Sequence, residues 1–286
     1  MLSSATIFSL NRFDRMTMKK TIPVLLLTMV AGLSACTKTS LTREPQLGIA
    51  WVESAAEYDA LTLQAYQNAT RHLDELIADK SATALPGQEA MAELPTAVIL
   101  DVDETSLSNV EFQIYIEGNF SHEAFDEWQH NNPSRQIEGA PEFVQAARDK
   151  GVTVFFITNR PCHERDFAPG PCPQEAITLQ DLAEAGIETD ADHLLLVGEK
   201  PEWNREKRFR QELVARDYRV IMLIGDDLGD FLPCTRAKPV TPCKAATAED
   251  RRRMIMEYSE YWGIRWNILP NPMHGSWSSF ISNDDE

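Results

Sequence analysis

Asp101 and Asp103 stand one residue apart at the end of an apolar run, residues 97–100. Because side chains alternate along a strand, both carboxylates lean to the same side where the predicted strand ends. Two like charges this close need an offsetting partner, and a divalent cation or a phosphoryl group provides one. The pair therefore predicts phosphoryl transfer through an aspartyl-phosphate. Asp101 would attack phosphorus, and Asp103 would protonate the leaving oxygen and later activate water.

Such a reaction also needs groups that hold the phosphoryl oxygens, and the chain offers candidates at two further places. Thr158 and Asn159 follow the apolar run 152–157, where a hydroxyl and backbone N–H groups could bind these oxygens. Lys207 lies on a predicted helix after the run 194–197 and would neutralise charge as the phosphoryl group transfers.

A further apolar run, 220–225, ends in two neighbouring carboxylates, Asp226 and Asp227. Either one could complete an oxygen-rich site with Asp101, and carboxylate oxygens are the ligands that magnesium prefers. The sequence therefore predicts Mg²⁺ as the cofactor.

An isolated Asp-x-Asp pair is also compatible with other functions. A metal-dependent glycosyltransferase would use Asp101 and Asp103 to hold a nucleotide-sugar diphosphate, but it would have no use for Thr158 or Lys207. A surface lipoprotein that binds a ligand without turning it over is a third alternative. The ordered set of polar groups, each at the end of an apolar run, favours phosphoryl transfer.

With these motifs, the chain resembles the haloacid dehalogenase superfamily of phosphohydrolases. The resemblance is carried by residues 101–105, 158–160, Lys207 and 225–231, and it covers most of the chain after residue 45. Within the superfamily the chain is most similar to the class C acid phosphatases, bacterial surface lipoproteins typified by the lipoprotein e family of 5'-nucleotidases. The resemblance implies a magnesium-dependent acid phosphatase that hydrolyses small phosphomonoesters, including 5'-nucleotides, with an acidic optimum.

The resemblance also implies a role for each site residue. Asp101 would be the nucleophile and Asp103 the general acid and base, while Thr158 and Lys207 would hold the phosphoryl group. Magnesium would lie between the Asp101 carboxylate, the Asp103 backbone carbonyl and Asp226.

Two positions depart from the family pattern. Asp227 stands where asparagine is common, so it could be a direct ligand, a water-mediated ligand or a bystander; Asp230 is a second carboxylate expected near the metal. His274 stands within the segment 271–277 where tyrosine is common, and this difference would alter which leaving group is preferred.

The stretch 107–138 is too long for a simple crossover loop and predicts a small helical cap over the site. Phe112 and Trp128 are expected to stack with His274 on a nucleobase or another aromatic leaving group, because the family places aromatic substrate contacts at comparable positions. The alternative is that these aromatic residues form the core of the cap itself.

The N-terminal residues indicate where the protein acts. Lys19 and Lys20 precede an apolar stretch, 22–33, that is too short for a comfortable membrane span. Residues 1–35 therefore resemble a bacterial lipoprotein signal peptide, with Cys36 as the lipidated residue and 36–48 as a tether. The expected location is the cell envelope, lipid-anchored and in the outer membrane; an ordinary secretory signal is the alternative.

The other four cysteines form two couples that are close in sequence. An oxidising compartment makes Cys162–Cys172 and Cys234–Cys243 the natural disulfides, each closing a short loop near a predicted strand end. Zinc binding is the alternative, but neither couple has Cys-x-x-Cys spacing.

The formal net charge of −17 at pH 7 disfavours binding to nucleic-acid polymers, and no basic patch is evident. Small phosphomonoesters remain possible substrates because Lys207 and a cation act locally. The sequence does not predict an oligomeric state.

The elements that must position these residues form an α/β pattern. Apolar strands are predicted near 97–101, 152–158, 193–197 and 220–225, and they alternate with helices near 141–150, 174–185 and 204–215. This alternation predicts a doubly wound parallel sheet with its site at the carboxyl ends of the strands. Amphipathic helices in 51–80 would pack outside the sheet. The phosphatase domain would span 49–280, followed by an acidic tail, 281–286.

Overall fold

The computed structural model describes residues 45–89, 91–116 and 120–281. The predicted signal peptide, the lipidation site Cys36, most of the tether and residues 282–286 of the acidic tail lie outside these ranges. Within the described residues, no helix is both long enough and apolar enough to span a membrane.

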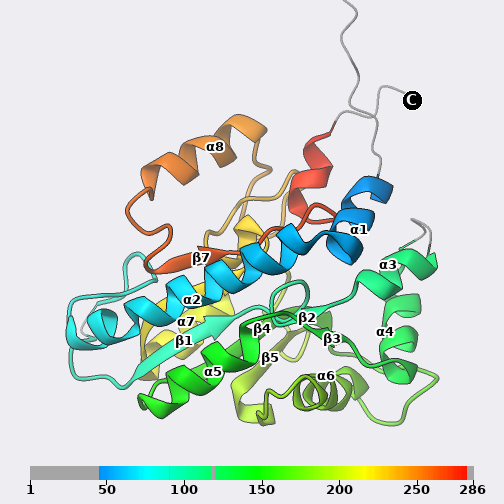
Figure 1. The fold of residues 1–286 in the computed structure, drawn as a ribbon, viewed down its shortest axis with the longest axis horizontal. Coiled ribbons are helices and arrows are strands. Elements are labelled where there is room, and N and C mark those ends of the chain that lie inside the picture. The colour runs from blue at the N-terminus through cyan, green and yellow to red at the C-terminus, as the bar shows by residue number, and fades with distance from the viewer. Residues whose placement is uncertain (1–44, 90, 117–119, 282–286) are drawn as a thin grey trace, which may run out of the picture. The chain divides into compact units, whose positions relative to one another are not determined.

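A five-stranded sheet forms the centre of the fold, with the order β5-β4-β1-β6-β7 (Figure 1). Every neighbouring pair is parallel. The strands are β1 (Thr96–Leu100), β4 (Thr153–Pro161), β5 (Leu194–Val197), β6 (Arg219–Gly225) and β7 (Trp266–Ile268). The chain winds outward from β1 in both directions, so the strand order reverses there, which is where ligands bind in doubly wound sheets. The predicted fold class is confirmed.

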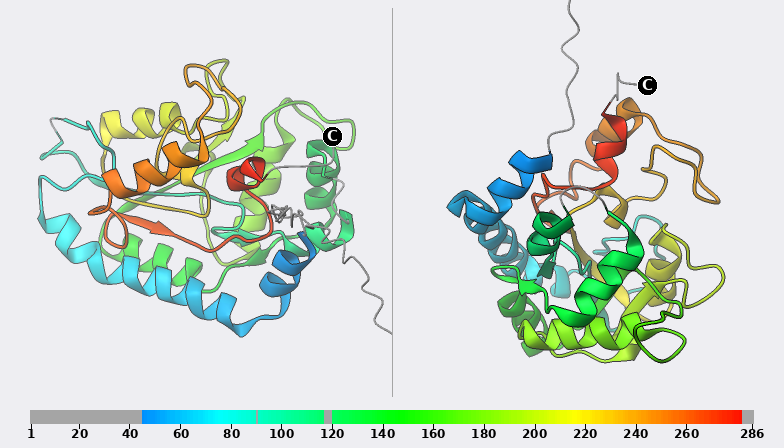
Figure 2. Two further views of the ribbon diagram at one scale, coloured as in Figure 1. Left: turned by 90° about the horizontal axis from the view of Figure 1, so that it is seen from above. Right: turned by 90° about the vertical axis from the view of Figure 1, so that its right-hand side faces the viewer.

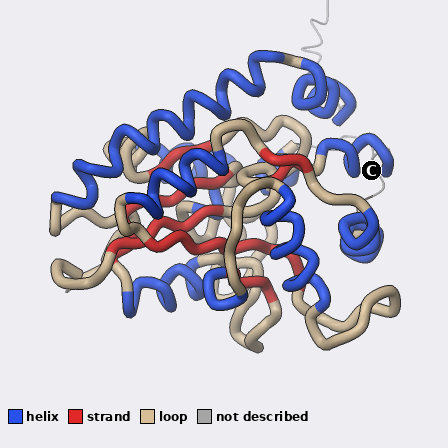
Figure 3. Tube along the Cα trace, turned by 60° about the horizontal axis from the view of Figure 1, so that its bottom comes forward, coloured by secondary structure: helices blue, strands red, loops and turns tan. Residues whose placement is uncertain are grey.

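Strand β1 shows why this sheet needs helices on both of its faces. Its side chains alternate, so Val98 and Leu100 join one apolar cluster while Ala97 and Ile99 join the other. Both sets are buried, as expected for a parallel strand covered on both sides. Figure 3 shows helices on either side of the strands.

Helices α2 (Ala56–Ala78), α5 (Ala140–Asp149) and α6 (Pro173–Glu184) contribute to the first cluster. Helices α7 (Arg208–Asp217) and α8 (Ala248–Glu257) contribute to the second. Figure 2 shows α2 and α5 on the side of the sheet opposite to α7 and α8. The described part of the chain also contains three short 3₁₀ helices: η1 (Ala191–His193), η2 (Leu228–Asp230) and η3 (Ser276–Phe280).

Helix α1 (Pro45–Ser54) overlaps residues 45–48 of the stretch assigned to the tether. The helix forms because it has an apolar face to bury. Val52 packs with Tyr58, Val110 and Met273 in a small cluster of its own.

The stretch between β1 and α5 forms a small cap. It contains α3 (Val110–Ile116) and α4 (His122–Asn131), flanked by the antiparallel pair β2 (Leu107–Ser108) and β3 (Arg135–Gln136). Ser121 starts α4 by accepting a hydrogen bond from the Ala124 N–H at 3.1 Å. Phe112, Ile116 and Phe125 form the core of the cap.

Two disulfides join the predicted couples. Cys162 pairs with Cys172 and Cys234 with Cys243, with Cα–Cα distances of 4.7 and 5.0 Å. Cys162 follows β4 directly and Cys172 immediately precedes α6, so this bridge closes a loop beside the carboxyl end of the sheet.

Candidate active site

Three carboxylates from two neighbouring strand ends converge at the carboxyl edge of the sheet. Asp101 follows β1, Asp226 follows β6, and Asp230 ends η2. They meet because β1 and β6 pair in parallel, with Leu100 opposite Ile224. One oxygen from each carboxylate lies within 4.8 Å of the others.

Lys207 lies within this group and is the N-cap residue of α7. Its Nζ is 2.5 Å from Asp101 Oδ1 and 2.7 Å from Asp230 Oδ1. Only 4% of the Lys207 side chain is exposed, so these ion pairs are shielded from water. Burial lowers the pKa of Lys207, but the charges of Asp101 and Asp230 outweigh it and leave that pKa raised. The ammonium is therefore charged across the physiological range.

One lysine does not balance three carboxylates. Burial and the neighbouring charges of Asp230 and Asp103 raise the pKa of Asp101 to about 7, although Lys207 opposes them. The pKa of Asp226 lies well above its usual value, because of burial first and then Asp230 and Asp101. An oxygen-only donor set with excess negative charge fits a hard divalent cation such as Mg²⁺. Asn271 Nδ2, donating to Asp226 Oδ2 at 2.7 Å, helps to hold this carboxylate in place.

Asp103 lies in a different electrostatic setting from Asp101. Arg160 donates to its two oxygens from Nε at 3.0 and 3.2 Å and from Nη2 at 2.8 Å. Asn109 Nδ2 donates to Asp103 Oδ1 at 2.9 Å. Burial raises the pKa of Asp103, but the Arg160 charge and these hydrogen bonds outweigh it, so that pKa is lower than usual. The sequence pattern included Arg160 but assigned no role to it.

Thr158 and Asn159 were expected to follow a strand, but β4 continues through Pro161. The polar residues extend the strand because their groups are paired. The Thr158 hydroxyl lies 3.4 Å from Asp103 Oδ2 and accepts from the Arg160 N–H at 3.0 Å. Asn159 Oδ1 accepts from Arg210 Nη2 at 2.8 Å. Thr158 thus lies beside Asp103, whereas the Asn159 side chain pairs with a buried arginine.

The neighbouring carboxylates Asp226 and Asp227 have different partners. Asp227 is the N-cap of η2 and accepts from the Gly229 N–H at 2.9 Å and from Ser276 Oγ at 2.8 Å. Burial raises the pKa of Asp227, but these hydrogen bonds outweigh it and leave that pKa lowered. Asp226 is therefore the one that joins Asp101, and Asp227 fastens η2 to the C-terminal segment. Asp230 was expected only near the metal, but its carboxylate lies in the same cluster as those of Asp101 and Asp226.

His274 lies against a carboxylate of the first motif. Its Nε2 is 3.1 Å from Glu104 Oε2, and Glu104 Oε1 accepts from the Asn109 N–H at 2.8 Å. Burial lowers the pKa of His274, but Glu104 outweighs it and leaves that pKa above its usual value. The His274 side chain is 37% exposed, so it remains accessible at the edge of the site.

The two aromatic residues expected to contact substrate differ in burial. Phe112 has no exposed surface, with its ring centroid 4.9 Å from that of Phe125. The Phe112 ring belongs to the cap core, as in the alternative given for these aromatic residues, and its contact with substrate stays a prediction. Trp128 is only partly buried and lies 4.7 Å from Tyr115, centroid to centroid.

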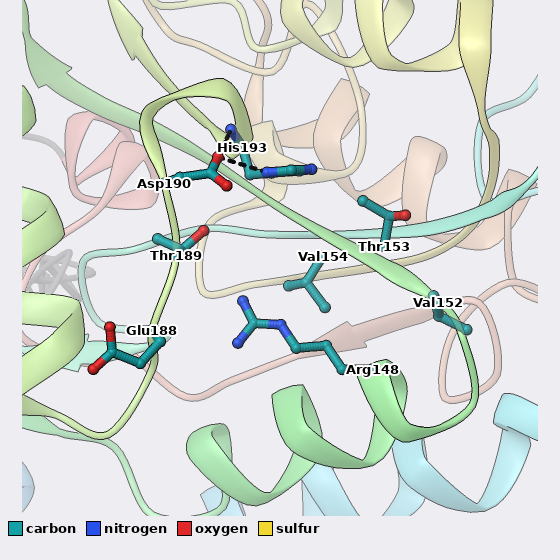
Figure 4. A pocket seen from close by; sticks show the side chains of 8 residues that line it. All are labelled: Arg148, Val152, Thr153, Val154, Glu188, Thr189, Asp190 and His193. Carbon is teal, nitrogen blue, oxygen red and sulfur yellow. Dashed lines mark hydrogen bonds and ion pairs between the residues drawn. The ribbon is translucent and has the colours of Figure 1, made fainter.

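Two of the cavities lined by described residues lie at different ends of the sheet. One, of about 460 Å³, is lined by Arg148, Thr153 and His193 (Figure 4). Thr153 is the first residue of β4, so this cavity lies at the amino end of the strands, away from Asp101. A second, of about 390 Å³, adjoins Asp226 and Asp227.

Comparisons with known proteins agree with this geometry. The family model for acid phosphatases of the HAD superfamily, subfamily IIIB, matches residues 25–277. The class C acid phosphatase from Bacillus anthracis is 25% identical with a TM-score of 0.67, over 85% of this chain and 90% of that one. A second structure of that enzyme, with tungstate bound, is 24% identical with a TM-score of 0.68, over 86% and 93% of the two chains.

The chain therefore belongs to the HAD superfamily subfamily IIIB acid phosphatases, and it is a phosphomonoesterase. The resemblance to class C acid phosphatases is confirmed. The comparisons give no support to the glycosyltransferase or to the inert binding protein.

Proposed function

We propose that this acid phosphatase is magnesium-dependent, acts through an aspartyl-phosphate, and accepts 5'-nucleotides among its small phosphomonoester substrates. The observation that carries the proposal is that Asp101 and Asp103 lie in different electrostatic environments. One carboxylate lies among acids beside Lys207, and the other is paired with Arg160. Paired carboxylates in contrasting environments are typical of groups with distinct catalytic roles.

Asp101, Asp226 and Asp230 have the donor atoms to hold the cation, and the family pattern adds the Asp103 backbone carbonyl. When bound, Mg²⁺ would offset the negative charge of the phosphoryl group.

In the first step, an Asp101 oxygen forms a bond to phosphorus while the bond from phosphorus to the leaving oxygen breaks. Asp103 gives its proton to that oxygen, so the leaving group departs as an alcohol and the phosphoryl group stays on Asp101. Lys207 Nζ and Thr158 Oγ1 bind phosphoryl oxygens. In the second step, Asp103 takes a proton from water as the water oxygen attacks phosphorus, which frees Asp101 and inorganic phosphate.

An acidic optimum is consistent with this assignment. Asp103 must be protonated for the first step, and the Arg160 pairing holds its pKa below the usual value. The protonated fraction of Asp103 therefore grows only as the pH falls into the acidic range, which favours turnover there. Asp101, whose pKa is about 7 without a cation, would stay ionised at that pH only with Mg²⁺ beside it.

A partly exposed Trp128 and His274 support a preference for aromatic leaving groups such as nucleosides. The ring of each could stack on a base, and a protonated His274 could also donate to one. A lipid anchor at Cys36 would tether the enzyme to the cell envelope, in the outer membrane. The two disulfides support an oxidising compartment.

The test is release of inorganic phosphate from a panel of 5'-nucleotides and aryl phosphates, with Mg²⁺ and with EDTA, between pH 4 and pH 8. Wild type is compared with Asp101→Asn and with Asp217→Asn, a matched change at the exposed end of α7. We expect Mg²⁺-dependent turnover that Asp101→Asn lowers by at least about 10⁴-fold and Asp217→Asn leaves unchanged. Turnover that survives in EDTA or in Asp101→Asn would overturn the proposed mechanism.

A further inference from the structure

Arg160 is a fully buried arginine whose donors are all occupied. It is 2% exposed, and its Nε and Nη2 bind the Asp103 carboxylate as a fork. Nη1 donates to Thr178 Oγ1 at 3.1 Å and to Asp181 Oδ2 at 2.9 Å. The side-chain amide of Gln129 also faces the guanidinium, and with its oxygen turned toward Arg160 it accepts from Nη2 at 2.5 Å.

These contacts join three elements around one carboxylate. Asp103 follows β1, Thr178 and Asp181 lie on α6, and Gln129 lies on α4 of the cap. The guanidinium carbon also lies 5.9 Å from the centre of the Phe125 ring, which belongs to the cap core. The position of the Asp103 carboxylate is thus coupled to both α6 and the cap.

A second set of hydrogen bonds holds Asp103 without Arg160. Asn109 Nδ2 donates to Asp103, and Ser134 Oγ lies 2.9 Å from Asn109 Oδ1 and 3.4 Å from Asp181 Oδ2. Because the hydroxyl has a single hydrogen, Ser134 donates to Asn109 at the shorter distance, and Asn109 in turn donates to Asp103. Asp103 is therefore held by Asn109 as well as by Arg160, which restrains its oxygens more firmly than a single pair would.

Another buried arginine shows what a purely structural role looks like in this fold. Arg219 is also fully buried, but its guanidinium donates to backbone carbonyls at the end of α2, those of Leu76, Ile77 and Asp79 among them. Arg219 completes a helix end, whereas Arg160 binds Asp103, the general acid of the proposed mechanism.

We propose that Arg160 is a positioning residue for the reaction: its fork fixes the Asp103 carboxylate in the orientation that protonates the leaving oxygen, and Asp181 fixes Arg160. Planar bidentate pairing sets the positions of both carboxylate oxygens, which a lysine ammonium does not do. The inference rests on the proposed function, because it takes Asp103 as the general acid.

Leaving-group dependence separates this role from a structural one. An alkoxide departs poorly without a proton, whereas 4-nitrophenolate departs readily, so only the first reaction depends strongly on a well-placed acid. The measured quantity is kcat/KM, which reports formation of the phospho-enzyme and leaves out its hydrolysis. For Arg160→Lys we expect a loss of roughly 100-fold with a 5'-nucleotide or another alkyl phosphate, within the range that general acid catalysis contributes. With 4-nitrophenyl phosphate we expect a loss of less than about fivefold, because little proton transfer is needed.

Asp103→Asn provides the reference for complete loss of the acid, and it should show the same selectivity to a larger extent. Arg219→Lys is the matched control, because it removes a buried guanidinium far from Asp103. It should change kcat/KM by the same factor for both substrates. If Arg160→Lys does not fold, Asp181→Asn takes its place, since it leaves the Asp103 fork intact but releases the far side of the guanidinium. For Asp181→Asn we expect kcat/KM to fall by about tenfold with the alkyl phosphate and to change little with 4-nitrophenyl phosphate.

The inference would be overturned if the folded Arg160→Lys or Asp181→Asn variant lost kcat/KM equally with both substrates, provided that Asp103→Asn still lost more with the alkyl phosphate. If Asp103→Asn also lost kcat/KM equally with both substrates, the proposed mechanism would be wrong instead. The same would hold if Asp101→Asn kept its activity.

Discussion

Asp101 and Asp103 come from one short motif, yet they lie in opposite electrostatic settings. The Lys207 cluster, formed by Lys207, Asp101, Asp226 and Asp230, has more acids than bases, and the pKa of Asp101 rises to about 7. The Arg160 cluster, formed by Arg160, Asp103 and Asp181, surrounds Asp103 with donors, and the pKa of Asp103 falls. Two residues of sequence therefore separate a carboxylate that shares one lysine with other acids from a carboxylate that is paired with its own arginine.

The difference indicates what each cluster requires from outside the protein. The Lys207 cluster becomes favourable when a cation and a phosphoryl group arrive together, because each offsets the charge of the other. The Arg160 cluster is complete without a ligand, so it can hold Asp103 in place before substrate binds. Preorganisation of this kind is what a proton-transfer group needs.

Lys207→Met should have the largest effect on this contrast. Loss of the ammonium should lower kcat/KM by about 10³-fold for alkyl and aryl phosphates alike, since charge on the phosphoryl group does not depend on the leaving group. Removing one partner of a buried ion pair also costs about 3–5 kcal/mol of unfolding free energy where the acids are ionised. That cost should be larger at pH 8 than at pH 5, because the acids with raised pKa values are neutral at acidic pH.

Kinetics with both substrate types and urea unfolding at the two pH values check the Lys207 prediction. A loss restricted to alkyl phosphates would mean that Lys207 acts through the leaving oxygen, and the two clusters would then share one role.

Asp226→Asn and Asp227→Asn form the next test, because these neighbours divide the ligand role from the capping role. Asp226→Asn should weaken Mg²⁺ binding by more than about 100-fold, because it removes a charged ligand from the cluster. This loss is larger than the loss expected for a residue that only hydrogen-bonds to a ligand. Asp227→Asn should change Mg²⁺ affinity less than about threefold and cost about 1 kcal/mol of stability, as for a weakened helix cap. Isothermal titration with Mg²⁺ measures the affinities, and equal losses in the two variants would show that Asp227 is a ligand.

The strand pattern made the sheet and its carboxylates predictable, because each apolar run of a buried parallel strand ends where the polar chemistry begins. Strand β7 was missed since it is only three residues long, Trp266 to Ile268. The end of β4 was placed too early because Thr158, Asn159 and Arg160 are polar, and their burial depends on partners that periodicity does not reveal.

The site itself was less predictable where tertiary contacts decide a role. Arg160 finds Asp181 on a helix 21 residues later, a pairing that exists only after α6 packs beside β4. Asp226 and Asp227 are adjacent acids, and the local geometry of η2 decides which one caps a helix. Phe112 had the right residue type for a substrate contact, but its position on α3 places it inside the cap.

Magnesium should stabilise the protein more at alkaline than at acidic pH. The pKa values of Asp101, Asp226 and Asp230 are raised in the folded state, so their contribution to stability is present at acidic pH, where they are neutral. It is lost as the pH rises, for Asp101 through about 7. A cation that binds the ionised cluster restores it, by about 2.7 kcal/mol when free Mg²⁺ is 100 times Kd.

Thermal unfolding with Mg²⁺ or EDTA at pH 5 and pH 8 measures this effect, with Asp226→Asn as the variant expected to show little Mg²⁺ shift. A shift in Tm of wild type that is larger at pH 5 than at pH 8 would contradict the charge balance described for the Lys207 cluster.

His274→Gln should have the smallest effect, because it changes an ion pair whose histidine is partly exposed at the edge of the Arg160 cluster. Glu104 raises the pKa of His274 above 6.5, so the pair contributes stability that is fully present below pH 6.5 and is lost as the pH rises through the folded-state pKa. Solvent screening limits the contribution to about 0.2–1 kcal/mol. The variant should therefore be less stable than wild type at pH 5.5 and nearly equal to it at pH 9, as measured by urea unfolding. The charge of His274 also lowers the pKa of Asp103 slightly, so its removal should move the alkaline limb of the kcat/KM profile toward higher pH. A limb that stays in place while the stability difference appears would show that Arg160 and Asn109 alone set the protonation of Asp103.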